Sequence, residues 1–104
     1  MNAKLHRIEK RIVEIKDELT KIGPMRPGSL TRQTRGPKQV GGYYQLSYTR
    51  CMKGHTEYVR PEWVDQVQRQ IATYHRFKQL VNEWISLAIK HSKWTITLAK
   101  RRHP

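Results

Sequence analysis

The feature that most constrains the fold is a run of six aliphatic residues near the start of the chain, spaced alternately three and four positions apart. These seam residues are Leu5, Ile8, Ile12, Ile15, Leu19 and Ile22. In an α-helix this spacing places every member on one face, where the six side chains form a narrow apolar seam. Residues 1–23 are therefore predicted to form a helix, which Gly23 and Pro24 end.

A seam of this kind needs a partner surface, and the sequence leaves two partners open. The seam spans fewer than three heptads, which is short for a coiled coil. A second helix of the same chain or the same seam of a second copy would cover it equally well. The six seam residues are therefore also the candidates for oligomerisation if the chain forms a homodimer.

A second amphipathic helix is predicted over residues 61–94. Pro61 suits the first helical position, and Glu62 and Asp65 place negative charge at the positive end of the helix dipole. The apolar residues that share one broad stripe are Trp63, Val67, Ile71, Tyr74, Phe77, Val81, Trp84, Ile85 and Ala88. The stripe predicts burial against the rest of the chain, and residues 95–104 follow as a basic tail.

Between the helices, residues 24–42 are rich in glycine, proline and cations and are predicted to form a basic loop that Ser29 and Leu30 anchor to the core. Residues 43–60 are predicted to form a β-hairpin, because Tyr44, Leu46 and Tyr48 alternate with polar residues. Met52, Lys53 and Gly54 would make its turn, with Gly54 supplying a positive φ.

The predicted fold class is α+β, in the order N-terminal helix, basic loop, β-hairpin and long C-terminal helix. Two strands alone are marginally stable in water, so the hairpin is expected to pack its alternating apolar side chains on the second helix. With 104 residues there is room for one small domain, residues 1–104.

Charge carries the main functional signal. The chain has 21 Lys and Arg against eight Asp and Glu, a formal net charge of +13. The excess is concentrated between Met25 and Arg60, where seven cations face the single acid Glu57. A charge excess of this size works against the compact state, and a polyanionic partner is its usual explanation.

The residues expected to contact nucleic acid come mainly from the loop and the hairpin. They are Arg26, Arg32, Arg35 and Lys38 as phosphate ligands, Tyr43 as a stacking or hydrogen-bonding residue, Arg50, Lys53 and Arg60 as an extension, and Lys100, Arg101 and Arg102 in the tail. The planar guanidinium of arginine suits phosphates and guanine edges, and a tyrosine ring can stack on an unpaired base.

Other classes of function find little support. Cys51 and His55 are too few for a structural zinc site, and the acidic residues are dispersed, so no metal site, cofactor or catalytic residue is predicted. The chain is not expected to be an enzyme. A single cysteine, no signal sequence and no long apolar run predict a cytoplasmic protein without membrane association.

Three motifs resemble those of a family of short, basic, uncharacterised prokaryotic proteins. They are Gly28-Ser29-Leu30, Tyr43-Tyr44-Gln45-Leu46-Ser47-Tyr48 and Lys53-Gly54, accompanied by Val64, Val67 and Tyr74. Members often occur beside transposon or phage genes, so the resemblance implies DNA or a nucleoprotein as partner. Where many relatives carry clustered cysteines, this chain has residues 31–38 without cysteine, so the metal knuckle of the family is not expected here.

These observations predict a nucleic-acid-binding accessory protein that tolerates many sequences, binds DNA rather than RNA and serves a mobile element or a nucleoprotein complex. Two alternatives remain open. One is an RNA-binding subunit of a ribonucleoprotein, and the other is a helical adaptor that binds protein without nucleic acid.

Overall fold

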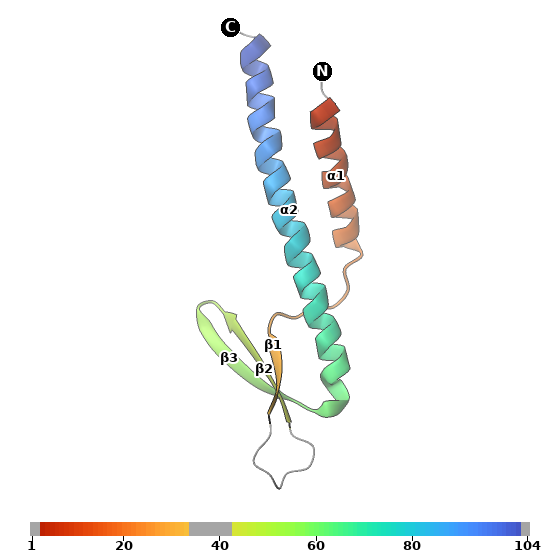
Figure 1. Cartoon of the computed structure of the whole chain (residues 1–104), viewed down its shortest axis with the longest axis vertical. Helices are drawn as coiled ribbons and strands as arrows, with labels where there is room; N and C mark the ends of the chain where they lie inside the picture. The colour runs from red at the N-terminus through yellow and green to blue at the C-terminus, as the bar shows by residue number, and fades with distance from the viewer. Residues whose placement is uncertain (1–2, 34–42, 103–104) are drawn as a thin grey trace. The chain divides into compact units, whose positions relative to one another are not determined.

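The computed structural model describes residues 3–33 and 43–102, and the chain divides into two compact units. The two-helix unit comprises Met1–Ile22 and Arg76–Pro104, and the sheet unit comprises Gly23–His75. Helix α2, Val64–Arg102, contributes its first three turns to the sheet unit and the remainder to the two-helix unit (Figure 1). The predicted α+β class and element order are confirmed.

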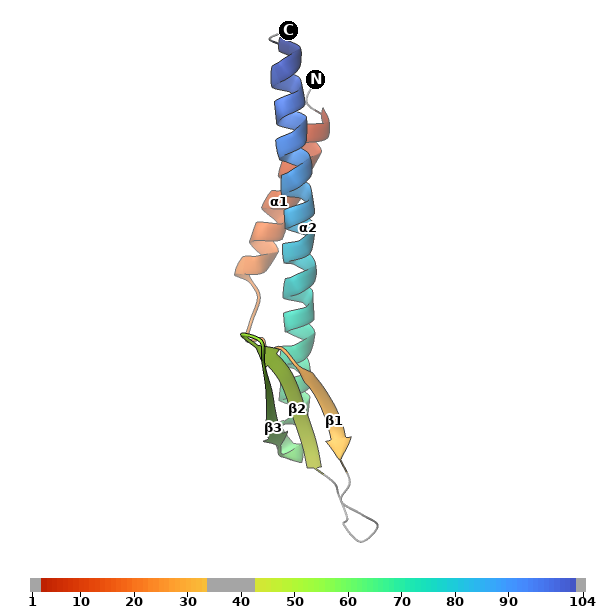
Figure 2. The ribbon, with the colours of Figure 1, turned by 90° about the vertical axis from the view of Figure 1, so that its left-hand side faces the viewer.

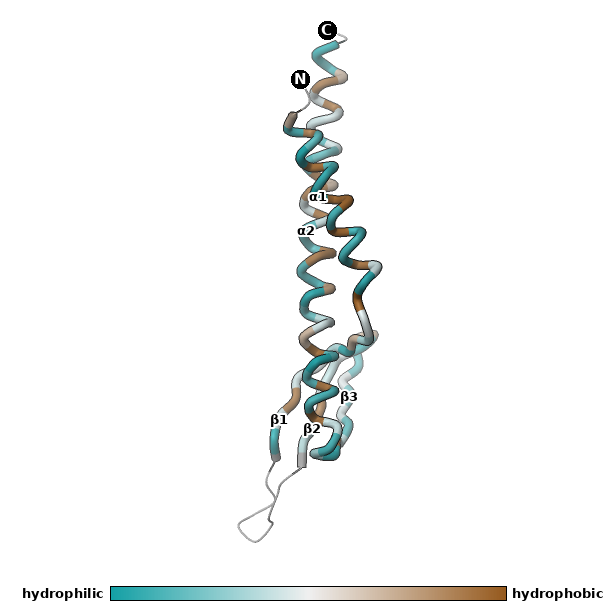
Figure 3. The backbone as a smooth tube through the Cα atoms, turned by 90° about the vertical axis from the view of Figure 1, so that its right-hand side faces the viewer, coloured by the Kyte–Doolittle hydropathy of each residue, from teal (hydrophilic) through white to brown (hydrophobic). Residues whose placement is uncertain are grey.

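In the two-helix unit, α1 (Ala3–Thr20) lies antiparallel to the C-terminal part of α2. The seam residues Leu5, Ile8 and Ile15 are buried, the other three are half-buried, and Leu80 of α2 is fully buried. Apolar and polar positions alternate along both helices (Figure 3). The partner of the seam in the structure is therefore α2 of the same chain, and a homodimer built on the seam would have to displace α2.

Helix α2 continues past residue 94, so the prediction of a separate tail over residues 95–104 is wrong for residues 95–102. The β-branched Thr95 and Thr97 suggested a break, but their hydroxyls donate to the carbonyls of His91 and Lys93 at 2.6 and 2.9 Å. Such bonds to the preceding turn satisfy threonine inside a helix. The cations of residues 100–102 occupy the last turn, where the helix dipole favours positive charge.

The sheet unit contains three strands, β1 (Ser29–Gln33), β2 (Tyr43–Arg50) and β3 (Lys53–Val59), all antiparallel with β2 in the middle (Figure 2). The prediction of a loop over residues 24–42 is therefore wrong for β1. Leu30 pairs with Leu46 in the register and packs against the core, as its expected anchoring role requires. Pairing of β1 with β2 also satisfies backbone N–H and C=O groups that would be hydrogen-bonded to water in a loop.

The core of the sheet unit joins the sheet to the start of α2. Leu46 is fully buried and clusters with Val59, Val64 and Val67. The residues packed around this cluster are Leu30, Tyr44, Tyr48 and Ile71. The prediction that the hairpin packs its alternating apolar residues on the second helix is confirmed.

The predicted apolar stripe of the second helix is wrong at Trp63, Ile85 and Ala88. Trp63 and Ile85 are each 53% exposed, and Ala88 is also exposed. Trp63 ends the 3-10 helix η1 (Pro61–Trp63), one residue before the buried Val64, and Ile85 follows the half-buried Trp84. One step along a helix rotates a side chain by about 100°, which is enough to turn it away from the core.

The hairpin turn differs from the predicted one. Arg50 pairs with Lys53, so the two turn residues are Cys51 and Met52, with φ of 54° and 66°. Positive φ at both central residues is the requirement of a type I′ turn, whose twist matches that of the strands. Gly54 pairs with Thr49 inside the ladder and does not supply the positive φ.

Candidate nucleic-acid interface

Two of the residues in the sheet unit that are predicted to contact nucleic acid already have carboxylate partners. The Arg26 guanidinium pairs with Glu57 and lies 5.3 Å from the centre of the Tyr48 ring, whose hydroxyl also donates to Glu57 at 3.3 Å. Arg60 lies 3.8 Å from the Glu62 carboxylate. The charge of both arginines is therefore partly neutralised within the protein.

Three other predicted ligands, Arg32, Arg50 and Lys53, are exposed and have no ion-pair partner within the described part of the chain. They share the face of the sheet that packs on α2, because their register partners lie on that face. Arg32 is opposite Tyr44, six residues along β2 from Arg50, a separation of about 20 Å at 3.3 Å per residue. Arg50 and Lys53 lie opposite each other beside the hairpin turn, and Arg32 lies at the far end of the sheet from them.

The opposite face of the sheet carries no charged residue over the strand positions that the structure describes. Its residues are Ser29, Thr31, Gln45, Ser47, Thr49, Thr56 and Tyr58. The sheet therefore offers no continuous basic face. Arg35 and Lys38 lie outside the described residues, and Tyr43 is the first residue of β2.

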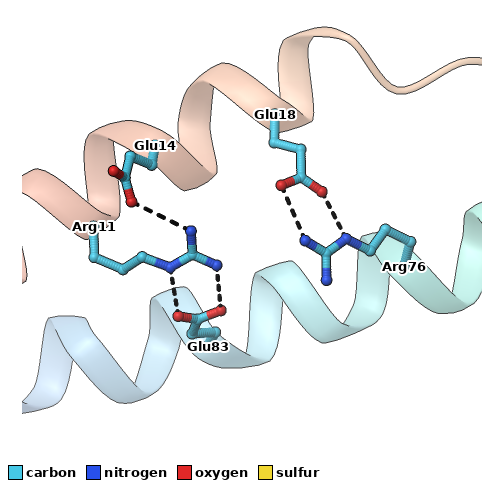
Figure 4. A network of polar contacts seen from close by, with 5 residues as sticks. All are labelled: Arg11, Glu14, Glu18, Arg76 and Glu83. Carbon is cyan, nitrogen blue, oxygen red and sulfur yellow. Dashed lines mark hydrogen bonds and ion pairs between the residues drawn. The ribbon is translucent and has the colours of Figure 1, made fainter.

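In the two-helix unit, a pair of bidentate ion pairs fixes the antiparallel register of α1 and α2 (Figure 4). Arg11 donates to both carboxylate oxygens of Glu83 at 2.6 and 2.8 Å, and Arg76 donates to both oxygens of Glu18 at 2.6 and 3.0 Å. Arg11 also reaches Glu14 at 3.4 Å. Planar fork-to-fork pairing of this kind specifies geometry as well as charge.

These contacts shift the pKa values of all four groups. The hydrogen bonds from Arg11 hold the pKa of Glu83 below its usual range, and those from Arg76 do the same for Glu18. The carboxylates raise the pKa of each arginine in return. All four side chains are charged at neutral pH, and the two arginines are satisfied inside the unit.

The unpaired cations gather at one end of the two-helix unit, where residues 3–10 of α1 lie beside residues 90–97 of α2 and α2 continues to Arg102. We call these residues the basic end: Lys4, Arg7, Lys10, Lys90, Lys93, Lys100, Arg101 and Arg102. The same stretches contain one acid, Glu9, which lies 3.1 Å from His91. The described remainder of the unit, residues 11–22 and 76–89, holds five cations and four acids and is nearly balanced.

Tryptophan 94 organises part of the basic end. The Lys4 ammonium lies 5.2 Å from the Trp94 ring centre, and the Arg101 guanidinium lies 5.7 Å from the same ring. Cation–π contacts of this length contribute about 0.5–1 kcal/mol at exposed sites. They draw cations from both helices toward one indole.

Sequence reasoning found only three residues of the basic end, Lys100, Arg101 and Arg102. It missed the others because charge was counted along the chain, where the first helix has six cations against four acids. The usable signal was the position of those acids, since Glu14, Asp17 and Glu18 all lie in the second half of that helix. An antiparallel helix pair then places the acid-poor half beside the end of α2.

Within residues 3–33 and 43–102, no three His, Cys, Asp or Glu side chains lie close enough together to hold a metal ion. No helix of that described part is both long and apolar enough to cross a bilayer. Comparisons with known protein families, curated proteins and solved structures find no match for this chain.

Proposed function

We propose that the protein binds nucleic acid, preferentially duplex DNA, through backbone phosphates and with little regard to sequence. The observation that supports the proposal most directly is the basic end, eight cations with one carboxylate on adjoining helix segments. Cations crowded in this way repel one another, and a polyanion relieves the repulsion while releasing its own counterions. Arg50 and Lys53 at the hairpin turn supply a second, smaller cationic site.

The composition of the basic end favours contacts to phosphate over reading of bases. Five of its eight cations are lysines, which act as point charges on flexible stems. Residues 3–10 and 90–102 contain no Asn or Gln, the side chains that bind adenine through paired hydrogen bonds. Sequence-tolerant binding is typical of an accessory protein, and the resemblance to proteins found beside transposon or phage genes points to a mobile element or nucleoprotein complex.

A matched pair of double variants on α1 tests the proposal. Arg7→Gln with Lys10→Gln removes two cations from the basic end, whereas Lys16→Gln with Lys21→Gln removes two from the balanced part of the same helix. Affinity for a labelled 20-base-pair duplex is measured by fluorescence anisotropy at about 0.1 M salt. Each lost phosphate contact lowers affinity by about tenfold at this salt concentration.

We expect the first variant to bind at least tenfold more weakly than wild type and the second to stay within about threefold of it. If the two variants lose the same amount of affinity, binding depends on net charge alone, and a specific role for the basic end is contradicted. Absence of binding by the wild-type protein to duplex DNA and to single-stranded RNA alike would refute nucleic-acid binding.

An apolar stripe on α2 favours a helical adaptor as the second candidate function. Ile85, Ile89 and Ile96 are 53%, 50% and 53% exposed, and their spacing of four and seven places them on one helix face. Such a face suits an amphipathic partner helix. A protein with this function would show no shift of any oligonucleotide in a gel, at low or moderate salt.

A further inference from the structure

A pocket of about 340 Å³ lies within the basic end, between the first turns of α1 and the last third of α2. Its lining residues are Lys4, Ile8, Lys90, Lys93, Trp94 and Thr97. The volume is at the lower end of the roughly 300–1,000 Å³ range of small-ligand sites. It therefore has room for one phosphorylated nucleotide unit and not for a duplex.

The electrostatics of the pocket favour a concentrated negative charge. Three of its six lining residues are lysines, and none is a carboxylate. Glu9, the one acid of the neighbouring helix segments, is held by His91. Three lysines line one small space, so their like charges repel one another and an anion bound there is attracted by all three.

One residue of the pocket wall carries a hydrogen-bond donor that has no partner among the described residues. Trp94 lines the pocket, and the indole Nε1 of Trp94 is buried with no acceptor among the residues that the structure describes. A buried donor without a partner costs about 1–3 kcal/mol, and a ligand oxygen recovers that cost only when the pocket wall moves enough to expose the nitrogen. Thr97 lines the same wall, but its hydroxyl hydrogen is already donated to the carbonyl of Lys93 at 2.9 Å.

We propose that this pocket binds the terminal phosphate of a nucleic-acid strand, so that the protein prefers phosphorylated DNA ends. A phosphomonoester carries about two negative charges at neutral pH and three acceptor oxygens, whereas each internal phosphodiester carries one negative charge. On a linear duplex only a phosphorylated end presents such a dianion, and a space of about 340 Å³ admits an end but not the body of a duplex. The inference rests on the proposed function, because it takes the nucleic acid as the source of the phosphate.

The test compares two duplexes of identical sequence, one with 5′-phosphates and one with 5′-hydroxyls, by competition in fluorescence anisotropy. We expect wild-type protein to prefer the phosphorylated duplex by about tenfold, since one additional charge is gained at the end. Lys4→Gln with Lys93→Gln should abolish that preference. Arg7→Gln with Lys10→Gln, outside the pocket lining, should weaken both duplexes and leave their ratio unchanged.

The outcomes separate the two levels of the proposal. Equal affinity of wild type for the two duplexes overturns the end preference and leaves nucleic-acid binding standing, whereas no binding to either duplex overturns both. If the variant with Lys4→Gln and Lys93→Gln still prefers the phosphorylated duplex, the pocket is not the site that binds the terminal phosphate. Circular dichroism confirms that each variant is helical, and a single Lys93→Gln variant serves if the double variant fails to fold.

Discussion

Replacing Gly28 by alanine is expected to destabilise the sheet unit by about 2–6 kcal/mol. Gly28 has a φ of +138°, a conformation that L side chains rarely adopt and that costs about 1–3 kcal/mol. A Cβ built at this position would lie 2.7 Å from Cδ1 of Leu46 and 3.1 Å from the carbonyl oxygen of Ser47. Overpacking of this kind costs about 1–3 kcal/mol more, because Leu46 is fully buried and its side chain must shift within the core to avoid the new methyl group.

The consequence should be large, since whole domains are stable by only about 5–15 kcal/mol. Urea unfolding followed by circular dichroism measures the change, and hydrogen exchange at the amides of Leu30 and Leu46 locates it in the β1–β2 pairing. Gly54→Ala is the matched control, because nothing lies within 4 Å of its Cβ position and its φ is not positive. Alanine there should change stability by less than about 1 kcal/mol. An unfolding midpoint for Gly28→Ala equal to that of wild type would refute the reasoning.

Three further predictions follow from the packing and the ion pairs. The pKa values of Glu18 and Glu83 in the folded protein are lowered from 4.5, so their contribution to stability is present above that pH and is lost as the pH falls through the folded values. The melting temperature of the two-helix unit should therefore stay level between pH 6 and 8 and drop below about pH 4. Leu46→Ala should lower the free energy of unfolding by about 2–5 kcal/mol in urea, and a loss below 1 kcal/mol would contradict its place in the core. Cys51→Asn with Met52→Gly should raise the melting temperature, because both residues then suit positive φ, and a fall would argue against the type I′ turn.

Periodic patterns predicted the helices and the hairpin because their signals are local. The seam from Leu5 to Ile22 and the alternation from Tyr44 to Tyr48 each specify which face is buried without reference to distant residues. Strand β1 was missed because its five residues, Ser29–Gln33, lie among glycines and prolines, and their pairing with β2 depends on the conformation of Gly28. A Cβ at residue 28 would collide with Leu46, 18 residues further along the chain, so the need for glycine there is not visible in the local sequence.

The candidate site was predicted only in part, for a similar reason. The composition alone gives the net charge of +13, and the sequence analysis included the cations of residues 100–102 among the predicted contacts. The basic end as a whole joins residues about 90 positions apart, so no window along the sequence contains it. The Lys4–Trp94 contact belongs to the same class of long-range feature. Conversely, Arg26 looked unopposed in the sequence because its partner Glu57 lies 31 residues further along the chain, in β3.

The most direct test of phosphate binding by the basic end is the salt dependence of its affinity for duplex DNA. If about six phosphate contacts form, affinity should fall by roughly a thousandfold between 50 and 200 mM salt. Replacing Lys100, Arg101 and Arg102 by glutamine should make the slope of log affinity against log salt shallower by about 2.7, at roughly 0.9 per contact. A slope near zero for wild type, or an unchanged slope in the triple variant, would contradict the account.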